Sequence, residues 1–112
     1  MDKIRLKFNY HQICAIDELL AEFVRVNINQ FSEQQKVVIS IGRLLATKFH
    51  TRRNNLDIKL SQIKPNEKFQ FTLLYFQVWA LKTILINNIA CISDEHQKFS
   101  VQKAIDQLDK NK

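Results

Sequence analysis

A single glycine, Gly42, and a single proline, Pro65, most strongly limit how this chain of 112 residues can fold. Tight turns and hairpins use residues that tolerate positive φ, so a chain with one glycine is built around few of them. The same scarcity excludes the glycine-rich loops that hold dinucleotides or nucleotide phosphates, because neither motif can be written with one glycine. The composition therefore favours helices and excludes these two kinds of nucleotide site.

Length and composition predict one domain spanning residues 1–112. The chain has 46% hydrophobic and 25% charged residues, close to the average of globular proteins. Its first residues, MDKIRLKF, alternate charged and apolar side chains and do not resemble a secretory signal, so we expect a cytoplasmic protein. Cys14 and Cys91 lack the spacing of a disulfide or metal motif, and we interpret both as buried thiols.

Two short segments alternate polar and apolar residues with the period of a strand that has one buried face. The first is Lys3 to Phe8, and the second is Leu56 to Ser61. Each leads into a helical pattern, and the similarity of residues 4–6 to residues 58–60 suggests a short internal repeat. We predict strands at 3–8 and 56–61.

Four helical segments follow from caps and apolar spacing. Asn9 is a suitable N-cap for a helix over 10–29, and Ser32 with Gln35 forms a capping box for a second helix that ends near residues 52–55. Gly42 lies inside this second helix, where it costs about 1 kcal/mol relative to alanine, so close helix packing is expected there. A third helix is predicted from Pro65 to about Ile92, and Ser93 is the expected N-cap of a fourth.

The third helical segment is apolar enough to raise the alternative of a membrane span. Between Phe71 and Ile92 its only charged residue is Lys82. Its apolar residues fall on two separate stripes, however, and a lysine near the centre of a span costs roughly 2.5 to 3.5 kcal/mol. We therefore predict no membrane association and a helix packed between two layers of protein. The stripes are Phe69, Leu73, Phe76, Ala80, Ile84 and Cys91, and Phe71, Leu74, Val78, Leu81, Leu85, Ile89 and Ile92.

These elements predict a mainly α (α+β) fold: a helix-dominated domain in the order strand, helix, helix, strand, helix, helix, with the two short strands paired. An all-α four-helix bundle is the alternative.

No arrangement of residues in the sequence requires an enzyme. The three histidines, His11, His50 and His96, have no zinc-binding spacing. His11 and Cys14 are neighbours on a helix, but nucleophilic chemistry would also need an orienting group and an oxyanion site in a cleft. We predict no catalytic residues, no metal and no cofactor.

Charge is the one uneven property of the chain. The formal net charge of +6 resides entirely in residues 36–68, because the remainder holds nine basic and nine acidic residues. A concentration of basic side chains attracts polyanions through counterion release. The candidate nucleic-acid-binding residues in this basic window are Arg43, Lys48, Arg52, Arg53, Lys59 and Lys64. Helix C-termini also favour cations, which gives Lys48, Arg52 and Arg53 a purely structural explanation.

We therefore expect a non-catalytic interaction or assembly module that forms a homodimer and binds a protein partner that the sequence does not identify. Nucleic-acid binding through residues 36–68 is the alternative function. Self-association is expected because the third helix has two apolar stripes to cover and because a two-stranded sheet leaves open edges. We expect the third helix or the first strand at the dimer interface.

Overall fold

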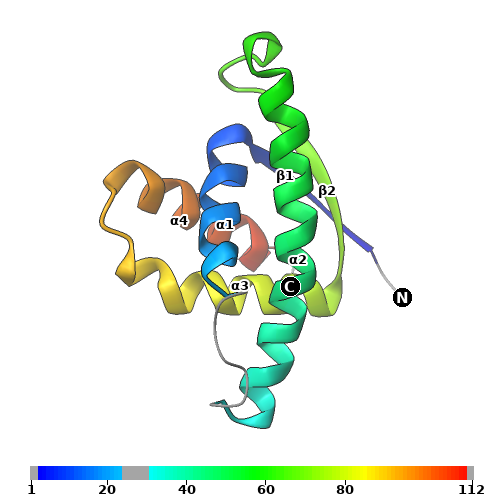
Figure 1. Cartoon of the computed structure of the whole chain (residues 1–112), viewed down its shortest axis with the longest axis vertical. Coiled ribbons are helices and arrows are strands. Elements are labelled where there is room, and N and C mark those ends of the chain that lie inside the picture. The colour runs from blue at the N-terminus through cyan, green and yellow to red at the C-terminus, as the bar shows by residue number, and fades with distance from the viewer. Residues whose placement is uncertain (1–2, 24–30, 111–112) are drawn as a thin grey trace.

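The computed structural model describes residues 3–23 and 31–110, which form four α-helices and one two-stranded sheet (Figure 1). This architecture confirms the predicted mainly α (α+β) fold and its order of elements, in preference to the all-α bundle. The elements are β1 (Lys3–Asn9), α1 (Tyr10–Phe23), α2 (Glu33–Ile58), β2 (Lys68–Leu74), α3 (Tyr75–Asn88) and α4 (Glu95–Lys110), with short 3-10 helices η2 at Leu60–Gln62 and η3 at Ile89–Cys91.

The two strands run antiparallel, with Lys3 opposite Leu74 and Asn9 opposite Lys68. The alternation seen in the sequence sets the two faces of β1: Leu6 and Phe8 are fully buried, whereas Lys3, Arg5 and Lys7 are exposed. The prediction of β1 is confirmed. Helix α1 is described up to Phe23; residues 24–29 of the predicted first helix lie outside the described residues.

The prediction of a second strand at 56–61 is wrong. Helix α2 continues to Ile58, and η2 follows it. Leu56 is buried seven residues after the buried Phe49, so the two share one helical face, whereas Ile58 is 83% exposed. The partner of β1 is instead β2, which occupies the start of the predicted third helix; α3 begins only at Tyr75.

A glutamine stands at the third position of each α-helix in the described ranges: Gln12, Gln35, Gln77 and Gln97. The first three accept a hydrogen bond from the backbone N–H of the residue preceding the helix, at 2.8 to 3.0 Å. Asn9 and Ser32 complete reciprocal capping boxes, which confirms the predicted N-cap at Asn9 and the predicted capping box of Ser32 with Gln35. For α4 the cap is Asp94 rather than the predicted Ser93, because the Asp94 carboxylate accepts from the N–H of Gln97.

Three phenylalanines from β1, α2 and β2 form the centre of the core. The rings of Phe49 and Phe71 are stacked with centroids 4.5 Å apart, and Phe8 lies 6.0 and 5.7 Å from them. Helix α2 thereby packs on the inner face of the sheet, while α1 lies beside α2 and α3 crosses both (Figure 1). The opposite face of the sheet remains open to solvent, since its residues Arg5, Lys7, Lys68 and Gln70 are exposed.

Gly42 marks the closest approach of α2 to α3. A Cβ atom added to Gly42 would lie 2.8 Å from Cδ1 of the buried Ile84, inside normal contact distance. The predicted reason for this glycine, close helix packing, is confirmed.

We expect Gly42→Ala to lower the free energy of unfolding by about 1 kcal/mol, because overpacking costs about 1 to 3 kcal/mol and improved helix propensity returns about 1 kcal/mol. In an Ile84→Val background, which lacks the clashing methyl group, the same substitution should stabilise the protein. Urea denaturation of the four proteins measures both effects. An equal loss in the two backgrounds would show that Ile84 is not the cause.

Candidate functional site

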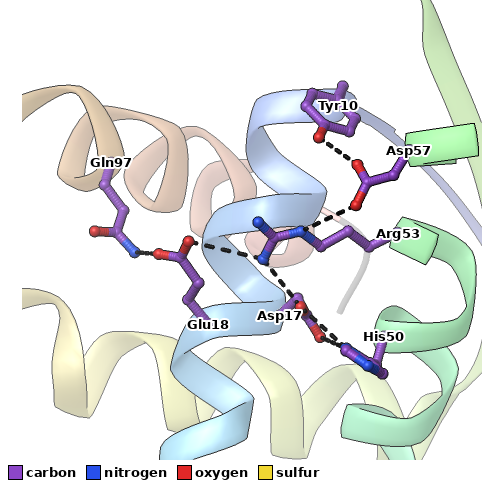
Figure 2. Close-up of polar contacts among 7 residues, drawn as sticks. All are labelled: Tyr10, Asp17, Glu18, His50, Arg53, Asp57 and Gln97. Atoms are coloured by element: carbon purple, nitrogen blue, oxygen red, sulfur yellow. Dashed lines mark hydrogen bonds and ion pairs between the residues drawn. The ribbon is translucent and has the colours of Figure 1, made fainter. Parts of the chain in front are cut away.

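A polar cluster joins α1, α2 and α4 (Figure 2). Its centre is Asp17, whose side chain is only 8% exposed. Nη1 of Arg53 donates to the Asp17 carboxylate at 3.1 Å, and Nδ1 of the largely exposed His50 lies 3.3 Å from it. The buried carboxylate is thus paired with the permanent cation of Arg53 and contacts a ring nitrogen of His50, as a buried charge requires a partner.

Further contacts extend the cluster from Arg53 in both directions. Arg53 also lies 3.7 Å from Glu18 and 4.0 Å from Asp57. The hydroxyl of Tyr10 donates to Asp57 at 2.5 Å, and the amide of Gln97 donates to Glu18 at 2.8 Å (Figure 2). Figure 2 shows Arg53 reaching from α2 towards α1, between the carboxylates. We interpret the cluster as a clamp between helices, since its charged groups are directed at one another.

The titration of two of these groups reflects the clamp. Burial lowers the pKa of Arg53, but the hydrogen bond to Asp17 and the nearby acidic groups outweigh it, so its pKa is raised. The hydrogen bond to Asp57 is the largest cause that raises the pKa of Tyr10, followed by contact with Cys14. Both groups are already protonated at neutral pH at their ordinary pKa values, and both shifts move the pKa further from neutrality.

The structure separates the basic residues predicted as a nucleic-acid site. Arg53 faces the carboxylates of α1, whereas the guanidinium of Arg52, its neighbour in sequence, lies 5.2 Å from the ring centroid of Phe71 on β2. Nζ of Lys48 donates to the backbone carbonyl of Thr72 at 2.8 Å. Arg52 and Lys48 therefore border the sheet, and Arg53 does not join them.

The other three predicted residues lie elsewhere on or after α2. Arg43 is half-buried near the middle of α2, next to Gly42. Lys59 is the C-cap of α2, and Lys64 begins the turn before β2, where its N–H donates to Glu67 at 3.3 Å. Of the six predicted residues, Arg53 is the one that contacts the carboxylates of α1 in the described part of the chain.

A small polar pocket of about 240 Å³ lies between α1 and α4. His11 and His96 meet in it edge to face, with ring centroids 5.0 Å apart, and Cys14 also lines it. Burial is the main cause that raises the pKa of Cys14, so its thiol stays protonated and is a poor nucleophile at neutral pH.

No group of three potential metal ligands occurs within residues 3–23 and 31–110. Cys14 is half-buried and Cys91 is exposed, so the prediction that both thiols are buried is wrong for Cys91.

The larger cavity is an apolar groove of about 610 Å³ between the first half of α2 and α3. Phe31, Val37, Val38, Ile39, Trp79 and Ile84 supply most of its lining. Gln34, Gln35, Thr83 and Asn87 add the polar groups, and none of the lining residues is charged. A groove of this size and character is suited to an apolar occupant.

One side of α3 continues the apolar lining onto the surface. Tyr75, Trp79 and Ile86 lie on this side with Thr83 between them, and the three are 55%, 47% and 46% exposed. None of the three belongs to the two predicted stripes, whose members Val78, Leu81 and Ile84 are buried within the chain. Helix α3 therefore has a third apolar face that the sequence analysis missed; the only tryptophan in the chain, Trp79, is the signal that could have revealed it.

None of the helices in the described ranges has the length and apolar character that crossing a bilayer requires. No family model, curated protein or solved structure matches this chain.

Proposed function

We propose that this protein is a non-catalytic interaction module that pairs with a second copy of itself through the apolar groove and the exposed side of α3. The observation that supports the proposal is the position of Trp79. This large side chain is half exposed at the rim of an uncharged groove. Covering its exposed apolar area with a partner would therefore contribute favourable free energy to association. Exposed apolar patches rimmed by polar residues are typical of protein interfaces.

A second copy fits this surface because the surface is self-complementary. The same helix supplies both projecting side chains, Trp79 and Ile86, and one wall of the groove, at Ile84. A two-fold axis across α3 would place the projecting side chains of each copy against the groove of the other. Two chains of formal charge +6 repel each other, so they approach most easily where neither is charged. The one lysine of α3, Lys82, is bound to Asp109 of α4 at 2.9 Å.

The alternative interface, the outer edge of β1, is less suitable. The side-chain amide of Gln107 on α4 donates to the carbonyl of Lys7 and accepts from its N–H, both at 2.6 Å. On the outer edge of β2, Nζ of Lys48 donates a hydrogen bond to the carbonyl of Thr72. These side chains already satisfy backbone groups that edge-to-edge pairing of strands would use.

The lone tryptophan makes the proposal testable. With rising protein concentration we expect the solution mass to double from 13.3 kDa and the fluorescence of Trp79 to shift to shorter wavelength over the same range. Light scattering and emission spectra measure the two changes on one sample. Ile86→Glu should keep the protein monomeric and its emission unshifted, because a buried unpaired carboxylate opposes association.

Ile58→Glu is the matched control, since Ile58 is an equally apolar but more exposed residue far along α2 from the groove, and it should dimerise normally. A stable monomer at all concentrations would contradict self-association. Doubling of mass without a shift in Trp79 emission would place the interface elsewhere. A monomer whose emission shifts only on addition of a small apolar dye would assign the groove to a small molecule.

A further inference from the structure

The solvent face of the sheet gathers basic residues from two distant parts of the sequence. Side chains of directly opposed residues lie on the same face, so Arg5 lies beside Thr72, Lys7 beside Gln70 and Asn9 beside Lys68. We use the name basic ribbon face for the outward-facing residues of the two strands, which are Lys3, Arg5, Lys7, Asn9, Lys68, Gln70, Thr72 and Leu74. Figure 1 shows the two strands side by side along α2. Of this set, only Lys68 belongs to the window 36–68.

The basic ribbon face contains four cations and no carboxylate. Lys3, Arg5, Lys7 and Lys68 are all exposed. Glu67, next to Lys68 in sequence, accepts a hydrogen bond from the N–H of Lys64 within its own turn. Lys48 and Arg52 of α2 border the outer edge of β2. The positive field here is therefore not cancelled by partners on the same face, in contrast to Arg53 in the clamp.

The uncharged residues of the basic ribbon face indicate which class of polyanion it can bind. No aromatic residue belongs to it, and stacking on aromatic rings is the usual means of binding single-stranded bases. Its one apolar residue, Leu74, is half-buried at the end of the strand, so no apolar group projects to enter a lipid surface. Gln70, exposed at the centre beside Lys7, has an amide that can pair with the edge of a base.

We infer that the basic ribbon face binds double-stranded DNA, with the ribbon in the major groove and the flanking Lys48 and Arg52 against phosphates. A two-stranded ribbon with its strands about 5 Å apart fits a groove about 12 Å wide. The major groove of double-stranded RNA is too deep and narrow to admit it. The inference does not depend on dimer formation, because each chain holds a complete ribbon.

Fluorescence anisotropy with a short mixed-sequence DNA duplex, titrated at several salt concentrations, tests the inference. The Arg5→Gln, Lys7→Gln double variant should weaken binding at low salt by roughly tenfold and reduce the slope of log affinity against log salt by about two. The matched control is Lys36→Gln with Lys98→Gln, which removes two charges from α2 and α4 away from the sheet. The control should bind within about twofold of the unmodified protein, because phosphate contacts rather than net charge set the slope.

Equal weakening by the two double variants would overturn the inference, because net charge alone would then account for binding. Tighter binding of the matching single strand, of an RNA duplex, or of vesicles containing phosphatidylserine would assign the face to that ligand and contradict the DNA proposal. Circular dichroism of each variant checks that the fold is retained. Arg5 and Lys7 are exposed strand residues, so for their double variant we expect loss of binding with retained structure.

Discussion

Replacing Phe49 with alanine should lower the free energy of unfolding by about 4 kcal/mol, the largest effect we expect from a single core substitution. Phe49 is fully buried and its ring contacts both Phe8 and Phe71. Truncation removes the ring that stacks on Phe71 of β2, and the surrounding core residues can relax into the resulting cavity only in part. Urea denaturation followed by circular dichroism measures the loss.

The matched control is Phe99→Ala, because Phe99 is 62% exposed on α4 and, among residues 3–23 and 31–110, its ring contact is with Lys103. That substitution should cost less than about 1 kcal/mol. If Phe49→Ala does not fold, Phe49→Leu provides a milder cavity with the same ordering of effects. Similar losses at positions 49 and 99 would contradict the assignment of Phe49 to the centre of the core.

Removing the arginine of the clamp should have the second largest effect. We expect Arg53→Met to cost about 3 kcal/mol, because the buried Asp17 carboxylate then keeps only the exposed His50 as a partner. The double variant Asp17→Leu, Arg53→Met should recover most of that loss, since replacing both partners by apolar residues leaves no unpaired charge. The same urea titration, carried out as a double-mutant cycle, gives the coupling free energy.

Lys82 and Asp109 provide the comparison for this cycle. Their ion pair is more exposed than the clamp, so breaking it should cost less than about 1 kcal/mol and show weak coupling. A coupling between Asp17 and Arg53 no larger than that of the exposed pair would show that the clamp does not hold α1 to α2.

The sequence predicts β1 and the N-caps of α1 and α2, because both depend on neighbours in the chain. Strict alternation from Lys3 to Phe8, a cap at Asn9 and the pair Ser32 with Gln35 are local patterns. The choice of the second strand is not local. Residues 56–61 and 68–73 both alternate, but only the second segment places two phenylalanines, Phe69 and Phe71, on the side that faces the core. Packing of Phe71 on Phe49 decides between them.

Because the second strand is predicted at 56–61, the sequence analysis does not predict the basic ribbon face. If residues 56–61 were the second strand, Lys3, Arg5 and Lys7 would have no basic neighbour on β2. In the net charge of the sequence they are cancelled by acidic residues elsewhere in the chain. Only the register that sets Lys7 opposite Gln70 brings them to Lys68. The groove was missed for a related reason, since residues from α2 and α3 meet there only after the helices pack at Gly42.

The long connection from β1 to its partners determines when the sheet can form during synthesis. Residues 3–9 are synthesised before residues 68–74, with which they pair, and the backbone groups of Lys7 on the outer edge bond to Gln107, which follows later still. Helices α1 and α2 can pack together earlier, because the Asp17–Arg53 contact at the centre of the clamp joins residues 36 positions apart. Until residues 68–74 emerge, the nascent chain exposes an unpaired strand with one apolar face, and this strand is a suitable binding segment for a ribosome-associated chaperone.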